Sequence, residues 1–285
     1  NFGLWGAATP SNRAELDTAA GERLIQGALA YLAVDDEPMA LRPEHFGQFL
    51  GFQSVLGVQA DTSRADDRVT PLLEDIRANE RNVHIIHLSR AEELNLLDPV
   101  RGDTTMTAGV TPHHLFLSDE QAETADGVHI NTRPPVRPEH DRRTLWTAVK
   151  RGRLDCVASD HHACGAAEGV PGSELMFPLM LSAVKYGRLS LELLVSLCSE
   201  SPARILGLEN KGRIAKGADA DLVLFSEGEV ARVGETDLMS GAGWSPYVDR
   251  EAAPKPDLVI VNGQIAAARG QLIGDQPHGR PVIQA

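Results

Sequence analysis

The stretch Val83-His84-Ile85-Ile86-His87 predicts a buried β-strand, because β-branched apolar residues dominate it and neither proline nor glycine interrupts it. A second stretch of this kind, Asp155-Cys156-Val157-Ala158-Ser159, ends at Asp160. Residues 104–111 form a further strand candidate between the two. Fully apolar strands of this length are typical of a sheet that is covered on both faces.

Helices with capping signals lie around these strands. Thr70-Pro71 begins one, with proline at the first helical position, and Asp141 and Ser190 each begin another. Ser201-Pro202 begins a short helix that ends at Gly207. Strands that alternate with helices in this way predict a parallel α/β sheet.

The pattern changes after Gly207. Residues 221–225 predict a strand, and Asn262-Gly263 separates two apolar runs as a type I′ hairpin turn does. The intervening residues 226–256 predict an irregular connecting segment. We therefore expect two domains, an α/β domain over residues 1–207 and a small β-domain with its connecting segment over residues 208–285.

Composition excludes several classes of protein. Of the 285 residues, 42% are hydrophobic, which excludes disorder as the main state. The net charge is −13, from 40 acidic and 27 basic residues, which disfavours nucleic-acid binding. Three cysteines make no secreted disulfide framework, and no apolar run reaches the roughly 20 residues of a membrane helix. With no signal peptide visible, we expect a cytoplasmic protein that does not bind membranes.

Histidine and aspartate side chains stand at the ends of the predicted strands. His87 ends the first strand, His113 and His114 follow the second, and Asp160 ends the third, before His161 and His162. Strand ends converge on one face of an α/β barrel, where two imidazoles and a carboxylate suit a zinc ion. The carboxylate could also move a proton from water to a leaving nitrogen. The alternative is that these histidines are ordinary core or loop residues, and the spacing alone leaves both interpretations open.

Several segments between Val83 and Gly270 resemble dihydroorotases, in the same order along the chain. They are His87-Leu88-Ser89-Arg90-Ala91-Glu92-Glu93-Leu94, Val110-Thr111-Pro112-His113-His114-Leu115, Pro134-Pro135-Val136-Arg137, Ala158-Ser159-Asp160-His161, Gly169-Val170-Pro171-Gly172-Ser173-Glu174 and Gly243-Trp244-Ser245-Pro246-Tyr247. The run from Ser201 to Gly207, followed by residues 212–223, is widespread in the amidohydrolase superfamily. Each motif is short, and their joint order gives the resemblance its weight.

The resemblance implies a (β/α)8 TIM-type barrel with a small β-sandwich appendage. It implies a zinc enzyme that cyclises N-carbamoyl-L-aspartate to dihydroorotate reversibly in pyrimidine biosynthesis. The resemblance also implies roles for single residues. His87 and His113 would be metal ligands, and Asp160 would be a ligand and the general acid/base. The implied substrate-binding residues are Gly172, His161, His162 and Arg137. The expected partners are a small-molecule substrate, further copies of the chain in a homo-oligomer, and aspartate carbamoyltransferase.

The sequence also departs from the family pattern. It contains no H-x-H pair with a following arginine, and no lysine precedes Lys150, so the family's bridging lysine has no counterpart. Gln59-Ala60-Asp61 stands where many members have H-x-E-D, and Arg133 replaces the asparagine before Pro-Pro. Cys164 stands where the family has a second histidine. Asp35 or Asp36 could match the V-D-D segment of one subgroup. The chain begins with Asn1, so we expect the barrel to be incomplete at its N-terminus.

Three hypotheses follow. The chain is an N-terminally truncated dihydroorotase, a non-catalytic homologue that acts as a scaffold for aspartate carbamoyltransferase, or an allantoinase or hydantoinase. Because the H-x-H pair and its arginine are missing, we expect the chain by itself to open dihydroorotate poorly or not at all.

Overall fold

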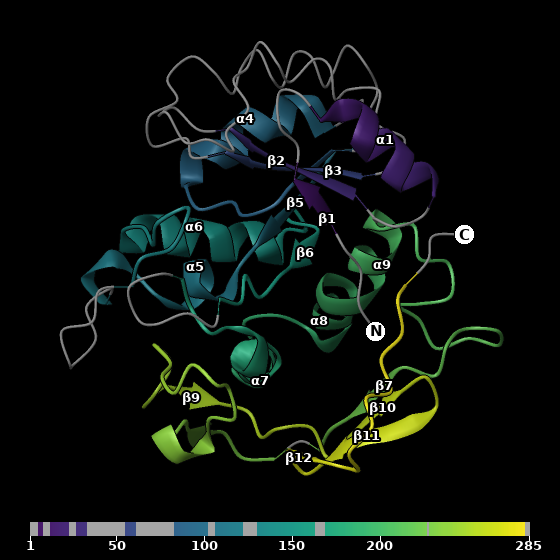
Figure 1. Ribbon diagram of the computed structural model, residues 1–285. Coiled ribbons are helices and arrows are strands. Elements are labelled where there is room, and N and C mark those ends of the chain that lie inside the picture. Colours follow the sequence, from purple (N-terminus) through teal and green to yellow (C-terminus); the bar gives the residue numbers. More distant parts are fainter. Residues whose placement is uncertain are drawn as a thin grey trace.

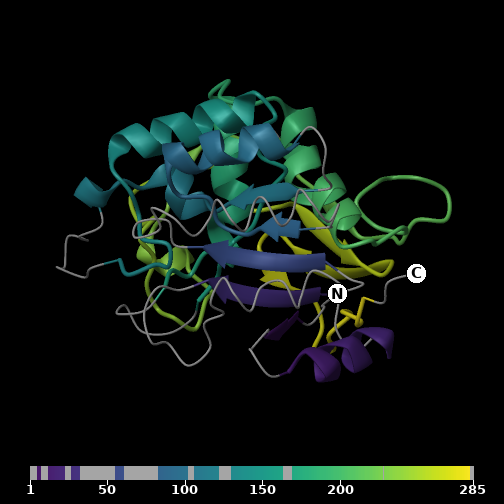
Figure 2. The ribbon, with the colours of Figure 1, turned by 90° about the horizontal axis from the view of Figure 1, so that it is seen from above.

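A parallel sheet carries the candidate site. The computed structural model describes residues 5–7, 12–22, 27–32, 55–60, 83–101, 106–121, 130–162, 169–226 and 228–282. Six strands lie in chain order, β1 (Trp5–Ala7), β2 (Gly27–Leu32), β3 (Val55–Ala60), β4 (Val83–Ile85), β5 (Thr107–Val110) and β6 (Cys156–Val157). Every neighbouring pair is parallel, and the arrows of β2 and β3 point the same way in Figure 2.

The predicted parallel arrangement is confirmed. β4 and β6 belong to one sheet, joined through β5, although each is shorter than the sequence predicted. His87 and Asp160 therefore lie just beyond the strand ends. Within the described residues the sheet has two strands fewer than a (β/α)8 barrel.

Helices follow and flank these strands (Figure 1). They are α1 (Arg13–Gly21), α4 (Ala91–Arg101), α5 (Pro112–Phe116), η3 (Asp119–Gln121), α6 (Glu139–Lys150), α7 (Ser173–Lys185), α8 (Leu191–Val195), the π-helical η4 (Ser196–Glu200) and α9 (Ser201–Ile205). Ser190 caps α8 as predicted, because its Oγ accepts the Leu193 N–H at 3.2 Å. The helix predicted at Thr70-Pro71 lies outside the described residues. No helix of the described part is both long enough and apolar enough to cross a bilayer.

The helix predicted to begin at Asp141 is present as α6, but its predicted first residue is wrong. α6 begins two residues earlier, at Glu139, and Asp141 lies in its first turn. Its Oδ1 instead accepts the backbone N–H of Ala91, at 2.7 Å, where α4 begins. An aspartate can satisfy the first N–H groups of any helix end that packs close to it, so a capping residue in the sequence need not cap its own helix.

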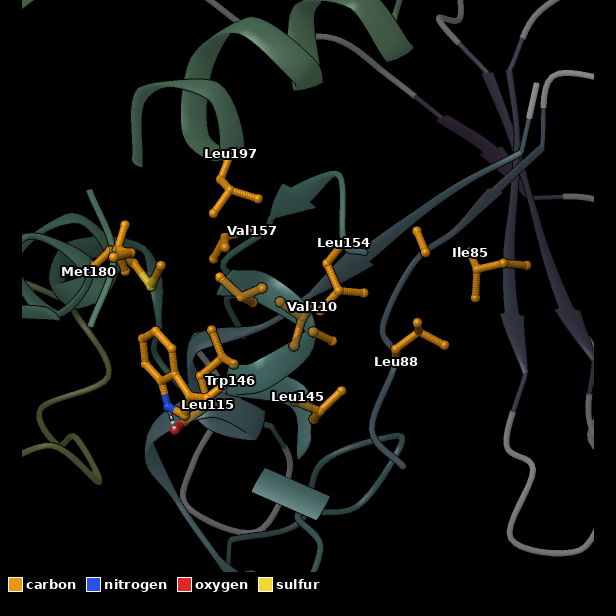
Figure 3. Packing of buried hydrophobic residues seen from close by; sticks show 14 of the residues in the cluster. Ile85, Leu88, Val110, Leu115, Leu145, Trp146, Leu154, Val157, Met180 and Leu197 are labelled. Carbon is orange, nitrogen blue, oxygen red and sulfur yellow. Dashed lines mark hydrogen bonds between the residues drawn. The ribbon is translucent and has the colours of Figure 1, made fainter. Parts of the chain in front are cut away.

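The hydrophobic core fills the space between the strands and α5, α6 and α7 (Figure 3). Leu115 and Leu145 are fully buried, and the Trp146 indole N–H donates to the carbonyl of Leu115 at 2.6 Å. The Phe116 ring meets the Trp146 ring edge-on, with 5.3 Å between centroids. Burying a large apolar side chain contributes about 1.5–3 kcal/mol of stability. This cluster therefore fixes the position of α5, the helix that carries the candidate ligand His113.

The tail forms antiparallel sheets. β7 (Leu222–Leu224), β10 (Leu258–Val261), β11 (Gln264–Ala268) and β12 (Gln271–Leu272) make a four-stranded sheet, which lies apart from the parallel sheet in Figure 1. The predicted hairpin is confirmed, since Asn262 and Gly263 have φ of 50° and 79°, both in the left-handed region that a type I′ turn requires.

The prediction of a merely connecting segment over residues 226–256 is wrong. This segment contains β8 (Ala231–Arg232), η5 (Glu235–Asp237) and β9 (Glu251–Ala252), with β8 and β9 paired antiparallel. Tyr247 and Val233 are buried in a second core with Leu175 and Leu179 of α7. Gly/Pro-containing composition predicted irregular backbone, but it could not show that α7 offers an apolar face for that backbone to cover.

Glu174, in the first turn of α7, ties this segment to the rest of the chain. Its carboxylate accepts the backbone N–H groups of Met239 and Ser240, at 2.9 and 3.0 Å, and pairs with the Lys255 ammonium at 2.9 Å. These bonds to a charged acceptor lower the pKa of Glu174 below its ordinary value, against the effect of its partial burial. A division into two domains at residue 207 stays a prediction.

Candidate metal centre

Three of the predicted site residues lie together. Asp160 Oδ2 is 3.7 Å from Nδ1 of His87 and 3.6 Å from Nε2 of His113. The two imidazoles are 8% and 0% exposed, whereas the carboxylate is 34% exposed. The site therefore has a buried imidazole wall and a carboxylate that water or a small molecule can reach.

Backbone contacts between neighbouring strands hold His87 in place. The N–H of Leu88 donates to the carbonyl of Gly109 on β5 at 2.9 Å. The next turn is closed by Glu93, whose buried carboxylate accepts the N–H groups of Ser89 and Arg90 at 2.7 and 2.9 Å. The chain that follows His87 is thus fixed on both sides.

His113 is positioned by the start of α5. Thr111 is the N-cap, and its Oγ1 accepts the N–H of His114 at 3.3 Å, while Pro112 fills the first helical position. The neighbouring His114 ring donates from Nε2 to the carbonyl of Pro134 at 3.2 Å, and its Nδ1 lies 2.7 Å from the Thr111 hydroxyl. His114 therefore joins α5 to the Pro-Pro segment. Of these two adjacent histidines, it is His113 that faces Asp160.

We expect Thr111→Val to lower the free energy of unfolding by about 1–2 kcal/mol, since it removes the cap and leaves the buried His114 nitrogen without its hydroxyl partner. Thr147→Val is the matched control, because the Thr147 hydroxyl bonds only to the carbonyl of Arg143 on the exposed face of α6. Urea unfolding of both variants gives the difference. Equal losses would show that Thr111 does not fix the start of α5.

Burial keeps the imidazoles neutral. It lowers the pKa of His87 to about 3, with smaller contributions from His114 and His84, and it lowers the pKa of His113 well below its ordinary value. Burial raises the pKa of Asp160 to about 6, against a smaller opposing effect of His162. The contacts of His87 and His113 with Asp160 are therefore not ion pairs near neutral pH, and both rings have the protonation state that binds a metal.

Two features of the donors at this position favour a metal ion. His87 Nδ1 and both ring nitrogens of His113 are buried without a hydrogen-bond partner among the described residues. Two ligands on a tetrahedral zinc ion lie about 3.4 Å apart, close to the separations of 3.6 and 3.7 Å from Asp160. In the part of the chain that the structure describes, however, no group of three or more His, Cys, Asp or Glu side chains is arranged so that it could hold a metal ion.

The predicted substrate-binding histidines directly follow Asp160 along the chain, and Arg137 contacts the loop after His87. His161 pairs with Val170 in an isolated bridge, and its exposed ring accepts the N–H of Ser173 at 3.3 Å. The exposed His162 is close enough to Asp160 to act on its charge. Arg137 donates from Nε to the Ser89 hydroxyl at 3.2 Å, so it lies beside the loop that carries His87.

Gly172 lies where the chain returns under the strand end. A Cβ added to it would be 2.5 Å from the carbonyl oxygen of Ser159, the residue before Asp160. Asp160 itself has a φ of 45°, which a non-glycine residue seldom adopts and which turns its side chain away from the strand direction. The Pro171–Gly172 loop and Asp160 are therefore packed backbone to backbone.

Some predicted residues cannot be placed. Asp35, Asp36, Asp61 and Cys164 lie outside the described residues, as does the side chain of Gln59. Arg133, which replaces the family asparagine, is exposed on the segment before Pro134.

Sequence reasoning missed two residues that position the site, Glu93 and Thr111. Their signals were present in the sequence, since Thr111-Pro112 is a helix start and Ser89 precedes an acidic residue by about one helical turn. Both residues belong to motifs in which only the histidines were predicted to be site residues.

Comparison with known proteins places this geometry in a family. The model of the amidohydrolase family matches residues 73–266, a range that contains His87, His113 and Asp160. This chain belongs to the amidohydrolase family.

Among curated proteins, this amidohydrolase is similar to dihydroorotases. It is 32% identical to that of Pyrococcus furiosus over 228 residues, covering 78% of this chain and 52% of the relative. It is 34% identical to that of Methanothermobacter thermautotrophicus over 205 residues, covering 68% of this chain and 46% of the relative. The amidohydrolase chain thus spans about half the length of the curated relatives it matches.

Among solved structures, the amidohydrolase resembles L-hydantoinase (dihydropyrimidinase) from Arthrobacter aurescens, with a TM-score of 0.88 and 22% identity. The match covers 99% of this chain and 73% of that chain. A likeness at this identity shows the fold, and it confirms the predicted TIM-type class of α/β barrel.

Proposed function

We propose that the protein is a dihydroorotase-like zinc amidohydrolase, which interconverts N-carbamoyl-L-aspartate and dihydroorotate. The observation that carries this proposal is the approach of two buried, neutral imidazoles, His87 and His113, to one carboxylate oxygen of Asp160. The similarity to curated dihydroorotases over most of the described site supports the choice of substrate.

His87, His113 and Asp160 would hold zinc. When bound, zinc polarises a carbonyl and makes water more acidic. Asp160, the one partly exposed member, takes a proton from the attacking water while the new C–O bond forms. It delivers that proton to the ring nitrogen as the C–N bond breaks, and the reverse transfers close the ring.

The remaining predicted residues would bind the substrate. Arg137 supplies a guanidinium for the substrate's carboxylate, in place of the arginine that follows H-x-H in the family. The exposed rings of His161 and His162 lie beside Asp160 and can donate to the ring oxygens. Gly172 allows the backbone of its loop to approach the reacting bond closely.

The finer features of the organisation are part of the same proposal. Residues 208–285 form a β-sandwich tail, and the protein acts in the cytoplasm as a homo-oligomer. Aspartate carbamoyltransferase is the proposed protein partner, because it makes the carbamoyl-aspartate that this reaction cyclises.

The test is an ultraviolet assay of dihydroorotate ring opening with added zinc. For the 285-residue chain we expect no rate above that of its Asp160→Asn variant, since two imidazoles and one carboxylate leave the metal shell incomplete. For the complete product of the gene we expect a zinc-dependent rate that Asp160→Asn removes. A rate in the 285-residue chain above its control would show that the ligand set proposed here is too small.

Two competing functions give different results in this assay. A scaffold without catalysis is favoured by the lack of a lysine before Lys150 and by Gln59, which stands where many family members have a histidine. This hypothesis predicts no ring opening by the complete product. An allantoinase or hydantoinase would open allantoin or hydantoin and leave dihydroorotate unchanged. Either result would overturn the dihydroorotase proposal.

A further inference from the structure

A cleft of about 610 Å³ lies away from the candidate metal centre, between α6, α7 and β9. These elements are neighbours on the side of the sheet that carries α5 (Figure 1). His87, His113 and Asp160 are not among the residues that line it. Its volume is in the range of about 300–1,000 Å³ that is usual for small-molecule sites.

Most acidic groups in this cleft are already engaged. Glu139 accepts two hydrogen bonds from Arg142, both 2.5 Å long, and one of 2.8 Å from Arg143. These bonds lower the pKa of Glu139 to about 2, with its slight burial opposing them. Glu251 accepts the hydroxyl of Tyr186 at 2.5 Å. A ligand in the cleft would therefore meet few free carboxylates, although the protein as a whole is acidic.

Arg250 also lines the cleft, and it takes no part in these carboxylate contacts. It is half-buried, and the hydrogen bond that the structure describes for its guanidinium runs from Nη2 to the neutral amide oxygen of Gln121, at 2.7 Å. Burial lowers the pKa of Arg250 below its ordinary value; Tyr247 opposes this effect, and the nearby charge of Arg142 adds a smaller lowering. A desolvated cation beside another cation is stabilised by any anion that binds between them.

Arg188 supplies a second guanidinium to the lining of the cleft. Its Cζ atom lies over the Trp146 ring, 5.6 Å from the centroid, and this contact orients the guanidinium without a carboxylate. Glu120 also lines the cleft, but its side chain is exposed, so water and salt screen its charge. Arg188 and Arg250 are thus two cations of the lining for which the structure describes no carboxylate partner.

The apolar contact that the cleft offers is Phe116, which is only partly buried. The edge-on contact with Trp146 fixes its ring, whereas Leu179 and Ala183 are 0% and 1% exposed. An aromatic ring in a cleft that is also lined by guanidinium groups suits a molecule with a carboxylate or phosphate at one end and an apolar body at the other.

We propose that this cleft is a second ligand site, which binds a small organic anion with its charged group on Arg250 and Arg188 and its apolar part on Phe116. The site is separate from the proposed catalytic centre, and it does not depend on the proposed reaction.

Isothermal titration calorimetry with phenyl phosphate tests this site. We expect phenyl phosphate to bind more tightly than inorganic phosphate, which lacks the apolar part, and we expect Arg250→Gln and Arg188→Gln each to weaken it about tenfold or more. Phenylacetate in a parallel titration shows which anionic group the cleft prefers. Arg250→Lys keeps the charge and should retain part of the affinity, which separates lost charge from lost folding.

Two controls locate the binding. Arg213→Gln removes the same charge at an exposed position outside the cleft and should leave the affinity unchanged. His113→Ala should also leave it unchanged, because the proposed metal centre is elsewhere. No binding of either aromatic anion, equal weakening by Arg213→Gln, or loss of binding in His113→Ala would each overturn the proposal.

Discussion

Replacing His113 with alanine is expected to lower the zinc affinity of the chain about a hundredfold or more, because removing even outer partners of metal ligands costs about 10–100-fold. The His113 ring is completely buried, both of its nitrogens lack partners among the described residues, and Nε2 faces Asp160. Equilibrium dialysis against zinc, with metal analysis of the protein, measures the change.

The matched control for this measurement is His140→Ala. His140 is exposed on α6, so its removal should change neither zinc content nor affinity. His113→Asn keeps most of the side-chain volume and shows whether the alanine variant loses zinc only because it has lost its packing. If zinc is bound substoichiometrically and His113→Ala does not alter it, the ligand assignment is wrong, while the fold is unaffected.

Gly172→Ala should lower the free energy of unfolding by about 3 kcal/mol, at the upper end of the usual cost of overpacking. The new Cβ would lie 2.5 Å from the Ser159 carbonyl oxygen, and neither backbone can yield easily. Gly172 is the N-cap of α7, where its carbonyl accepts the Met176 N–H at 3.0 Å, and Ser159 directly precedes Asp160. We therefore expect zinc affinity to fall as well, since the carboxylate must move.

Gly241→Ala is the control for this change, because an added Cβ there has no neighbour within 4 Å and should alter unfolding only slightly. Urea unfolding of both variants gives the difference in stability. A Gly172→Ala variant as stable as Gly241→Ala would mean that the loop and the strand end are not packed as described.

Local signals predicted much of this fold. The apolar runs around Ile85 and Val157 predicted two strands of one parallel sheet, and Asn262-Gly263 predicted the hairpin of the tail, because each signal depends on adjacent residues alone. The convergence of His87 and Asp160 followed from the rule that parallel strands end on one face.

Contacts between distant segments could not be predicted in this way. Asp141 caps a helix fifty residues earlier, and the segment around Tyr247 covers α7 from far along the chain. The cleft that Arg188 and Arg250 line could not be predicted for the same reason, since its lining comes from α5, α6, α7 and the residues around β9. The composition gives the net charge of the whole chain, which is −13. The local charge of a cleft depends instead on which of its carboxylates are paired with cations.

The Glu174 carboxylate has a consequence for how such chains can change over evolutionary time. It belongs to the motif that begins α7, yet two of its partners are backbone groups of residues 239 and 240, and its third is Lys255. A recombination event that exchanged the C-terminal segment between homologues would preserve these bonds only if the incoming loop placed the same two N–H groups and an ammonium there. The loop that supports Asp160 and the C-terminal segment are therefore inherited most safely together, even though more than sixty residues separate Glu174 from its nearest partner along the chain.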